Sequence, residues 1–327
     1  MTGCETMINL KCRVENPNQV IDMLAKGTIT PVEAFILFKE IDEKKSEAVK
    51  PPTEEKIEDI MKELDSLVGL TKVKQLVKEI QAFVEIQKRR QKEQLVSEPL
   101  VLHMIFKGNP GTGKTTVARL FGKIFKQMDV LQKGHLVEVE RADLVGEYIG
   151  HTAQKTREQI RRALGGILFI DEAYSLARGG EKDFGKEAID TLVKAMEDHK
   201  DNLIVILAGY KDEMDWFLRT NPGLRSRFPI QIEFSDYTIE ELMEIAKIMV
   251  EKRQYKLTPE AYAKLERVLK GSKNSAYYDK MGNARLVRNL IEKAIRRQAL
   301  RLVNQKHISR EDLIYIKEED IAEMEEM

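Results

Sequence analysis

Short apolar segments alternate with helical patterns through the middle of this chain. Each apolar segment has the length of a strand, and between the segments apolar residues recur every three or four positions, as they do on one face of a helix. The pattern predicts helices from Lys114, near 153–164 and near 186–197, between strands at 100–106, 136–140, 166–170, 203–208 and 230–234. Strands separated by helices are typical of parallel βαβ units. We therefore expect an α/β domain with a five-stranded parallel sheet flanked by helices, within residues 51–235.

The sequence before this sheet contains two helical patterns that we assign to the same domain. The first starts at Glu54 and ends at the break Leu67-Val68-Gly69-Leu70. The second follows directly and leads into a segment at 88–98 that is charged and then loop-like.

Residues 1–50 are predicted to form a small appendage whose role stays open between partner docking, regulation and a structural cap. A weak alternation at 8–14 is typical of a short strand. A helix is expected from Thr30-Pro31, because Thr30 can cap it and Glu33 can complete a capping box. The polar segment that follows ends in Pro51-Pro52 and is interpreted as a linker.

The strand pattern stops after Phe234, and residues 236–327 are expected to form a small all-helical domain. Thr238 and Glu241 have the spacing of a capping box at the start of its first helix. Further helices are predicted from Thr258-Pro259, over 283–303 and from Ser309.

Composition and charge narrow the possible functions. The 327 residues are 42% hydrophobic and 33% charged, which is ordinary for a soluble globular protein. Lys and Arg number 54, as do Asp and Glu, and this balance argues against a nucleic-acid binder that relies on a broad basic field. We see no membrane span and no secretory signal, and Cys4 and Cys12 match no metal pattern, so a cytoplasmic protein is expected.

A glycine-rich motif follows the first predicted strand. It reads Gly108-Asn109-Pro110-Gly111-Thr112-Gly113-Lys114-Thr115, with Thr116 next. The glycines lack Cβ, so backbone N–H groups can close around an anion at the positive end of the following helix. Lys114 is expected to reach the β- and γ-phosphates of a nucleoside triphosphate, and the Thr115 hydroxyl is expected to hold Mg²⁺.

Two carboxylates, Asp171 and Glu172, follow the apolar strand predicted at 166–170. The carboxyl ends of parallel strands meet at one edge of the sheet, so this pair should lie beside the glycine-rich loop. Asp171 is expected to bind Mg²⁺, mostly through water, and Glu172 to polarise the attacking water as a general base.

The glycine-rich loop, the Asp171-Glu172 strand and the C-terminal helical domain together resemble an AAA+ ATPase. The stretches 107–119, 141–157 and 165–190 are most similar to the CbxX/CfxQ branch, in particular to members from spore-forming bacilli. The resemblance covers roughly 64–299 and implies ATP as the nucleotide.

The resemblance also implies roles for residues around the nucleotide. Val68 and Gly69 match the segment that lines the adenine pocket. Arg285, in Gly282-Asn283-Ala284-Arg285, matches the sensor 2 arginine, with Arg288 as a reserve candidate. Many members carry Asn or Thr as sensor 1, whereas this chain has Tyr210 near that place, so sensor 1 stays unassigned with Tyr210 as a weak candidate.

Other implied roles reach beyond one subunit. Tyr148-Ile149-Gly150 resembles the pore loop that grips polypeptide, although Tyr148 could also be a core residue, and 178–185 would be a second pore loop. The segment that carries Arg225 and Arg227 resembles an arginine finger, which completes the active site of a neighbouring subunit. We favour Arg227, with Arg225 second.

The function implied is an ATP-hydrolysing homo-oligomeric ring, expected to be a hexamer, that remodels or threads a protein substrate through a central pore during bacterial spore formation. A Rubisco-activase-like remodeller of the same branch is one alternative. A DNA-acting AAA+ ATPase is another, although zero net charge argues against it. A P-loop metabolic kinase and a nucleotide-gated scaffold also stay open.

Overall fold

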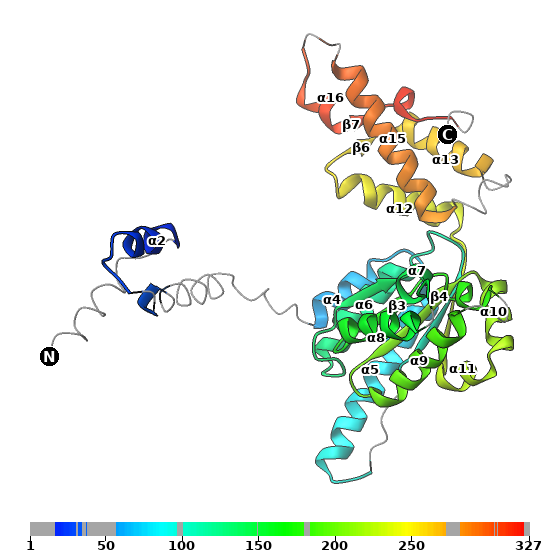
Figure 1. Ribbon diagram of the computed structural model, residues 1–327. Helices are drawn as coiled ribbons and strands as arrows, with labels where there is room; N and C mark the ends of the chain where they lie inside the picture. The colour runs from blue at the N-terminus through cyan, green and yellow to red at the C-terminus, as the bar shows by residue number, and fades with distance from the viewer. Residues whose placement is uncertain are drawn as a thin grey trace. The chain divides into compact units, whose positions relative to one another are not determined.

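A computed structural model describes residues 17–30, 32–34, 37, 57–96, 101–148, 150–179, 184–272, 282–303, 305 and 307–323. The chain divides into two compact units, Met1–Lys56 and Ile57–Met327 (Figure 1). In the first unit, helix α2 spans Pro17–Ala25, which the sequence pattern did not predict. The predicted capping box is present, since the backbone N–H groups of Thr30 and Glu33 donate to each other's side chains. The strand predicted at 8–14 and the linker lie outside the described residues.

The second unit contains the predicted five-stranded parallel sheet. Its strands run in the order β2-β3-β4-β1-β5, and every pairing is parallel. The strands are β1 (Met104–Gly108), β2 (Leu136–Val139), β3 (Ile167–Ile170), β4 (Ile204–Gly209) and β5 (Ile230–Phe234). Strand β4 thus lies between β1 and β3, and the carboxyl ends of all three share one edge.

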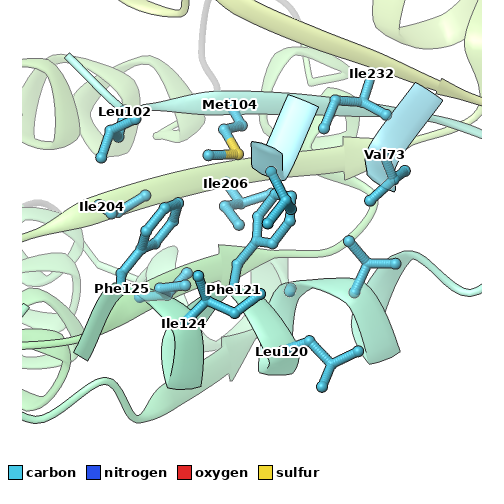
Figure 2. Packing of buried hydrophobic residues seen from close by; sticks show 14 of the residues in the cluster. Val73, Leu102, Met104, Leu120, Phe121, Ile124, Phe125, Ile204, Ile206 and Ile232 are labelled. Carbon is cyan, nitrogen blue, oxygen red and sulfur yellow. The ribbon is translucent and has the colours of Figure 1, made fainter. Parts of the chain in front are cut away.

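Alternate residues of strands β1, β3 and β4 enter two separate hydrophobic cores. Phe106 faces one core with residues of α4 (Ile57–Asp65), α5 (Thr71–Lys92) and α6 (Lys114–Gln127). Figure 2 shows Phe121 and Phe125 of α6 turned toward strand residues of this core. Ile105 faces the other core, which includes residues of α8 (His151–Ala163), α9 (Gly185–Asp198) and α10 (Lys211–Thr220). Helix α6 packs in the first core, so the glycine-rich loop leads from the end of β1 to that face of the sheet.

Several element boundaries differ from those predicted. Helix α5 continues to Lys92, past the point where a loop-like segment was expected, and an ion pair one turn apart, between Arg89 and Glu85, lies on its exposed surface. The short helices α7 (Arg141–Leu144) and α11 (Pro222–Arg227) were not predicted. Four-residue and six-residue helices are too short to show a helical period in the sequence.

Strand β1 begins later than predicted because of a histidine side chain. The backbone N–H of Val205 donates to Nδ1 of His103, 3.0 Å away, and regular pairing between β1 and β4 starts only at the next residue pair. The ring is buried and packs 5.9 Å from that of Phe228, at the end of α11.

We expect His103 to make the protein less stable at acidic pH. Burial lowers the pKa of His103 from about 6.5 to about 4, so the unfolded chain binds this proton at a higher pH than the folded chain does. The stability contribution is therefore complete above about pH 6.5 and is lost as the pH falls toward 4, at up to about 1.4 kcal/mol per pH unit. Chemical denaturation of His103→Asn, whose amide oxygen can still accept the Val205 bond, should show a flatter pH profile. Equal slopes for the two proteins would contradict this assignment.

The C-terminal part is helical as predicted, with one addition. Its helices are α12 (Ile239–Glu251), α13 (Pro259–Ser272), α15 (Asn283–Val303) and α16 (Arg310–Ile314). The prediction of an all-helical domain is wrong in one detail, because β6 (Lys256–Leu257) pairs in parallel with β7 (Tyr315–Ile316). The buried Gln298 side chain donates to the Tyr315 carbonyl and holds the second strand in place. Within the described residues, no helix has the length and apolar character needed to cross a membrane.

Candidate functional site

The carboxyl ends of β1, β3 and β4 open into a cavity of about 710 Å³. The loop after β1, the acidic pair after β3 and the end of β4 form one side of its wall. The break between α4 and α5 and residues of α12 and α15 form the rest. Wall residues expected from the sequence are Val68, Gly108, Pro110, Gly111, Gly113, Lys114, Thr115, Thr116, Asp171, Glu172, Tyr210, Arg285 and Arg288.

The glycine-rich loop has the backbone that an anion cradle requires. Gly111 and Gly113 have φ angles of 74° and 95°, in the left-handed region that glycine adopts without strain. Two loop residues, Asn109 and Thr112, are not among the described wall residues, and their side chains form other bonds. The Thr112 hydroxyl donates to the Asn109 carbonyl at 2.8 Å, and the Asn109 side chain donates to the Asp236 carboxylate.

The Lys114 ammonium is folded back into this loop. Its Nζ donates to the carbonyl oxygens of Gly108 and Asn109, at 2.8 and 3.0 Å. Burial lowers the pKa of Lys114, while the nearby Asp171 carboxylate acts in the opposite direction. A phosphate group in the cradle would offer this cation charged oxygens, which form stronger hydrogen bonds than neutral carbonyls do.

Asp171 and Glu172 are fixed at the end of β3 by backbone bonds. The Asp171 N–H donates to the Val139 carbonyl at 3.0 Å and so extends the pairing with β2. The Glu172 N–H donates to the Asp171 carboxylate at 3.0 Å. Glu172 adopts a left-handed φ of 47°, which costs a residue with a side chain about 1–2 kcal/mol. Such strained residues cluster at functional sites, which is consistent with a catalytic role for Glu172.

Tyr210 lies where β4 ends and contributes to the cavity wall. Burial raises its pKa, and the Glu172 carboxylate acts in the same direction, so its hydroxyl stays protonated at neutral pH. Its ring centroid is 6.2 Å from that of Tyr174, whose own pKa is also raised by burial. Tyr210 is therefore a neutral donor beside the proposed base, and the sequence did identify it as a candidate.

An apolar part of the wall suits a nucleotide base. Val68 belongs to it together with Leu67, Leu70, Ile245, Ile248 and Met249. Gly69 is not among the described wall residues. Its φ of 65° and the Glu241 carboxylate, 2.6 Å from where a Cβ would lie, instead indicate a tight turn against α12. The structure thus places Val68 at the cavity and Gly69 behind it.

The two finger candidates lie outside this cavity, on α11. Arg227 donates from Nη2 to the Glu197 carboxylate at 2.6 Å and from Nη1 to the Gly223 carbonyl at 2.9 Å. Arg225 is exposed and, within the described residues, forms no ion pair. Neither arginine is among the described residues of the cavity wall.

Tyr148 lies at a well-anchored but exposed loop. Its side chain is 66% exposed, which rules out a core position, and its ring packs at 5.5 Å against that of His151. Two buried hydroxyls support the base of the loop. Thr152 Oγ1 accepts from the Gly146 N–H, and Thr156 donates to the Leu144 carbonyl. Gly150 has a φ of 82°, while Ile149 and residues 180–183 of the predicted second pore loop lie outside the described residues.

The wall residues fit a Mg²⁺ ion that is shared with a nucleotide. Thr115 offers a hydroxyl and Asp171 a carboxylate to the same cavity, and oxygen donors of this kind suit Mg²⁺. Over the described residues, no group of three His, Cys, Asp or Glu side chains gathers as a metal site. Two protein donors are sufficient here, because Mg²⁺ keeps several waters and takes its other ligands from phosphates.

The sequence reasoning missed Asp236, Tyr237 and Asn283 as functional candidates. They link the outside of the glycine-rich loop to the start of α15. Asn283 stands in the quoted tetrapeptide Gly282-Asn283-Ala284-Arg285, where only the arginine was given a role. Its contacts depend on the fold, and only its place beside Arg285 could have pointed to it.

Comparison with known families identifies the class of this protein. Residues 104–236 match the ATPase family associated with various cellular activities (AAA), and residues 238–327 match the AAA lid domain. The chain belongs to the AAA ATPases and hydrolyses ATP. Within that family it belongs to the CbxX/CfxQ branch.

The relatives support that placement over most of their length. Stage V sporulation protein K of Bacillus subtilis (strain 168) is 58% identical over 270 residues, which cover 83% of this chain and 84% of that protein. Protein CbbX of Cereibacter sphaeroides is 48% identical, covering 75% and 79%. The chloroplastic ribulose bisphosphate carboxylase/oxygenase activase of Cyanidioschyzon merolae (strain NIES-3377 / 10D) is 46% identical, covering 81% and 91%. The RuvB Holliday junction branch migration motor of Thermotoga maritima shares the fold, with a TM-score of 0.50 at 23% identity over 76% of this chain and 69% of that chain.

Proposed function

We propose that this protein is a cytoplasmic, ATP-driven homo-oligomeric ring, a hexamer, that remodels a protein substrate by threading it through a central pore during bacterial spore formation. One cavity that brings together the phosphate loop, Glu172 and Arg285 carries the proposal. The finger arginines lie outside that cavity, which supports a site completed by a neighbouring subunit. The similarity to stage V sporulation protein K supports the biological role.

The geometry supports a division of labour within the site. The loop from Gly108 to Thr116 holds the phosphates of ATP, and Lys114 turns from its own carbonyls to the β- and γ-phosphates. Thr115 and Asp171 hold Mg²⁺, which when bound neutralises developing phosphate charge. Val68 contacts the base, and Gly69 shapes the turn behind it.

Hydrolysis then needs a base, a water and compensation of charge. Glu172 accepts a proton from the water as the water oxygen attacks the γ-phosphorus, and ADP leaves with the bond electrons. Tyr210 can donate to the water or to a phosphate oxygen from the same wall. Arg285, from the lid, and Arg227 or Arg225, from a neighbour, stabilise the negative charge of the transition state.

Tyr148→Ala should keep ATPase activity and assembly but abolish the protein's ability to support spore formation. An exposed aromatic ring on an anchored loop gives sequence-tolerant contact with a polypeptide, and the loop contributes nothing to the cavity wall as described. The measurement is complementation of spore formation in a Bacillus subtilis strain that lacks stage V sporulation protein K. Tyr262→Ala is the matched control, because Tyr262 is also exposed but lies on α13. Full complementation by Tyr148→Ala would contradict the threading role.

A Rubisco-activase-like remodeller is the second candidate function. It is favoured by the identity of 46–48% to CbbX and to the chloroplastic activase. The mechanism would be the same, so the two candidates differ only in substrate. If purified protein with ATP reactivates inhibited red-type Rubisco while failing to restore sporulation, this second candidate replaces the first.

A further inference from the structure

The outside of the glycine-rich loop is bonded to the lid and to the segment that leads into it. Three consecutive loop carbonyls accept hydrogen bonds there. The donors are Asn283 Nδ2 to Pro110 at 3.4 Å, the Ala284 N–H to Gly111 at 3.2 Å, and the Tyr237 hydroxyl to Thr112 at 3.2 Å. A phosphate would be bound by backbone N–H groups of the loop. The bonds named here go to the loop's carbonyl oxygens, so they do not compete with phosphate for those N–H groups.

The Asp236 carboxylate adds a second kind of link between the loop and the lid, through side chains. Asp236 accepts from Asn109 Nδ2 at 3.1 and 3.0 Å, one distance to each of its oxygens. Its Oδ1 also accepts from Asn283 Nδ2 at 2.8 Å. Asn283 completes the arrangement by accepting from the Tyr237 N–H at 2.9 Å. One path of side chains from loop to lid is therefore Asn109, Asp236 and Asn283, and it runs beside the direct bonds to the loop carbonyls.

The position of Asn283 requires an asparagine for two reasons. Its φ is 59°, a left-handed conformation that Asn tolerates better than most residues do. Its side chain, in a residue that is 1% exposed, must donate on one side and accept on the other. Aspartate would keep the shape and the acceptor but would place a second carboxylate against Asp236. Alanine would leave the buried N–H of Tyr237 without its side-chain partner.

The contact between loop and lid is also close enough to transmit displacement. A Cβ on Gly111 would lie 2.8 Å from the Arg285 backbone nitrogen and 2.8 Å from the Gly282 carbonyl oxygen. Backbone therefore packs directly on backbone, two residues after Asn283, where Arg285 enters the cavity wall. A change in the loop on phosphate binding or release cannot leave the start of α15 unaffected.

We propose that Asn283 and Asp236 are positioning residues for ATP hydrolysis, which tie the start of α15 to the phosphate loop so that Arg285 follows the loop's phosphate state. The proposal rests on the proposed function of the cavity. It gives the lid a second link to the nucleotide, through the protein and independent of direct contact between Arg285 and phosphate.

A charge-conserving swap tests this link. Asn283→Asp should lower kcat about tenfold or more, because a carboxylate at this buried position would face the Asp236 carboxylate and the buried donor would be lost. Asp236→Asn should cause a smaller loss, since its amide oxygen can still accept from Asn109 and Asn283. In the double variant, the amide introduced at position 236 can donate to the carboxylate introduced at position 283 while accepting from Asn109, so most of the lost activity should return.

The readout must separate positioning from general structure. Hydrogen exchange measured with and without ADP should show nucleotide protection at 108–116 in all three variants. Protection at 283–290 should be lost in Asn283→Asp and restored in the double variant. Unchanged kcat and lid protection in Asn283→Asp would overturn the proposal, and so would a folded double variant that is as impaired as the single one.

Two further variants cover the remaining outcomes. If Asn283→Asp does not fold, Asn109→Ala and Asp236→Ala are compared with the variant that carries both changes. If the two residues lie on one path, the double variant should be little worse than the more impaired single variant. Additive losses of activity would mean that the two residues act independently. Lys114→Ala tests the cavity itself. If Lys114→Ala binds nucleotide normally, the proposed site fails, whereas loss of binding there with no effect of Asn283→Asp overturns only the link through Asn283.

Discussion

Glu172→Gln is expected to bind ATP with nearly unchanged affinity and to hydrolyse it about 10²–10⁴-fold more slowly. The amide keeps the length and shape of the side chain but cannot accept a proton from the attacking water. The substitution leaves the glycine-rich loop, Lys114 and the apolar part of the wall around Val68 unchanged, so the contacts that hold ATP remain. Fluorescent-nucleotide titration and steady-state phosphate release measure the two quantities on the same preparation.

Two matched variants make this result specific. Asp171→Asn should weaken Mg²⁺-dependent nucleotide binding as well as turnover, because Asp171 is the proposed metal ligand and also holds the Glu172 N–H. Glu213→Gln removes a carboxylate that helps to raise the pKa of Tyr210 but is not among the described residues of the cavity wall, so ATP turnover should remain high. An unchanged rate in Glu172→Gln would remove Glu172 from the mechanism.

The sequence could predict those parts of the fold that are determined by local patterns. Buried strands such as β3 are continuous apolar runs, and capping boxes such as Thr238 with Glu241 lie within one turn, so both are visible without a structure. The two-residue strands β6 and β7 carry no periodicity and could not be predicted. The late start of β1 depends on His103 reaching Val205, 102 positions away.

The same distinction explains the candidate site. The P-loop and Asp171-Glu172 are contiguous motifs, and the parallel sheet brings them to one cavity as expected. Asn283 and Asp236 meet across 47 positions, and each is an ordinary polar residue in the sequence. Their role depends on the packing of the lid against the loop, which no local pattern contains.

The ion pair between Arg227 and Glu197 was likewise not predictable, and it bears on the arginine finger. Glu197 holds Arg227 within its own subunit, on α9, while Arg225 is exposed. The pair is partly exposed, and such pairs contribute only about 0–1 kcal/mol, so a neighbour's γ-phosphate can compete for the guanidinium. The pairing can therefore orient Arg227 at the subunit surface without preventing its transfer to a charged ligand.

Arg227→Ala should lower ATP turnover about 10³-fold or more without weakening ATP binding to the same subunit, whereas Arg225→Ala should cause a much smaller loss. A finger compensates the charge that develops in the transition state, and alanine supplies none. Glu197→Gln is the control for a purely structural role, because it breaks the ion pair and leaves the arginine. If Glu197→Gln loses as much activity as Arg227→Ala, the ion pair and not the finger explains the effect.

Mixing two inactive proteins distinguishes a finger that acts on a neighbour from one that acts within its own subunit. Arg227→Ala subunits keep Glu172, and Glu172→Gln subunits keep Arg227. In a mixed ring, some interfaces place an intact Glu172 opposite an intact Arg227, so ATP turnover should rise above that of either variant alone and reach its maximum at intermediate ratios. An arginine that acts within its own subunit leaves every site defective at every ratio, and the mixture then shows no recovery. Recovery with Arg225→Ala but not with Arg227→Ala would assign the finger to Arg225.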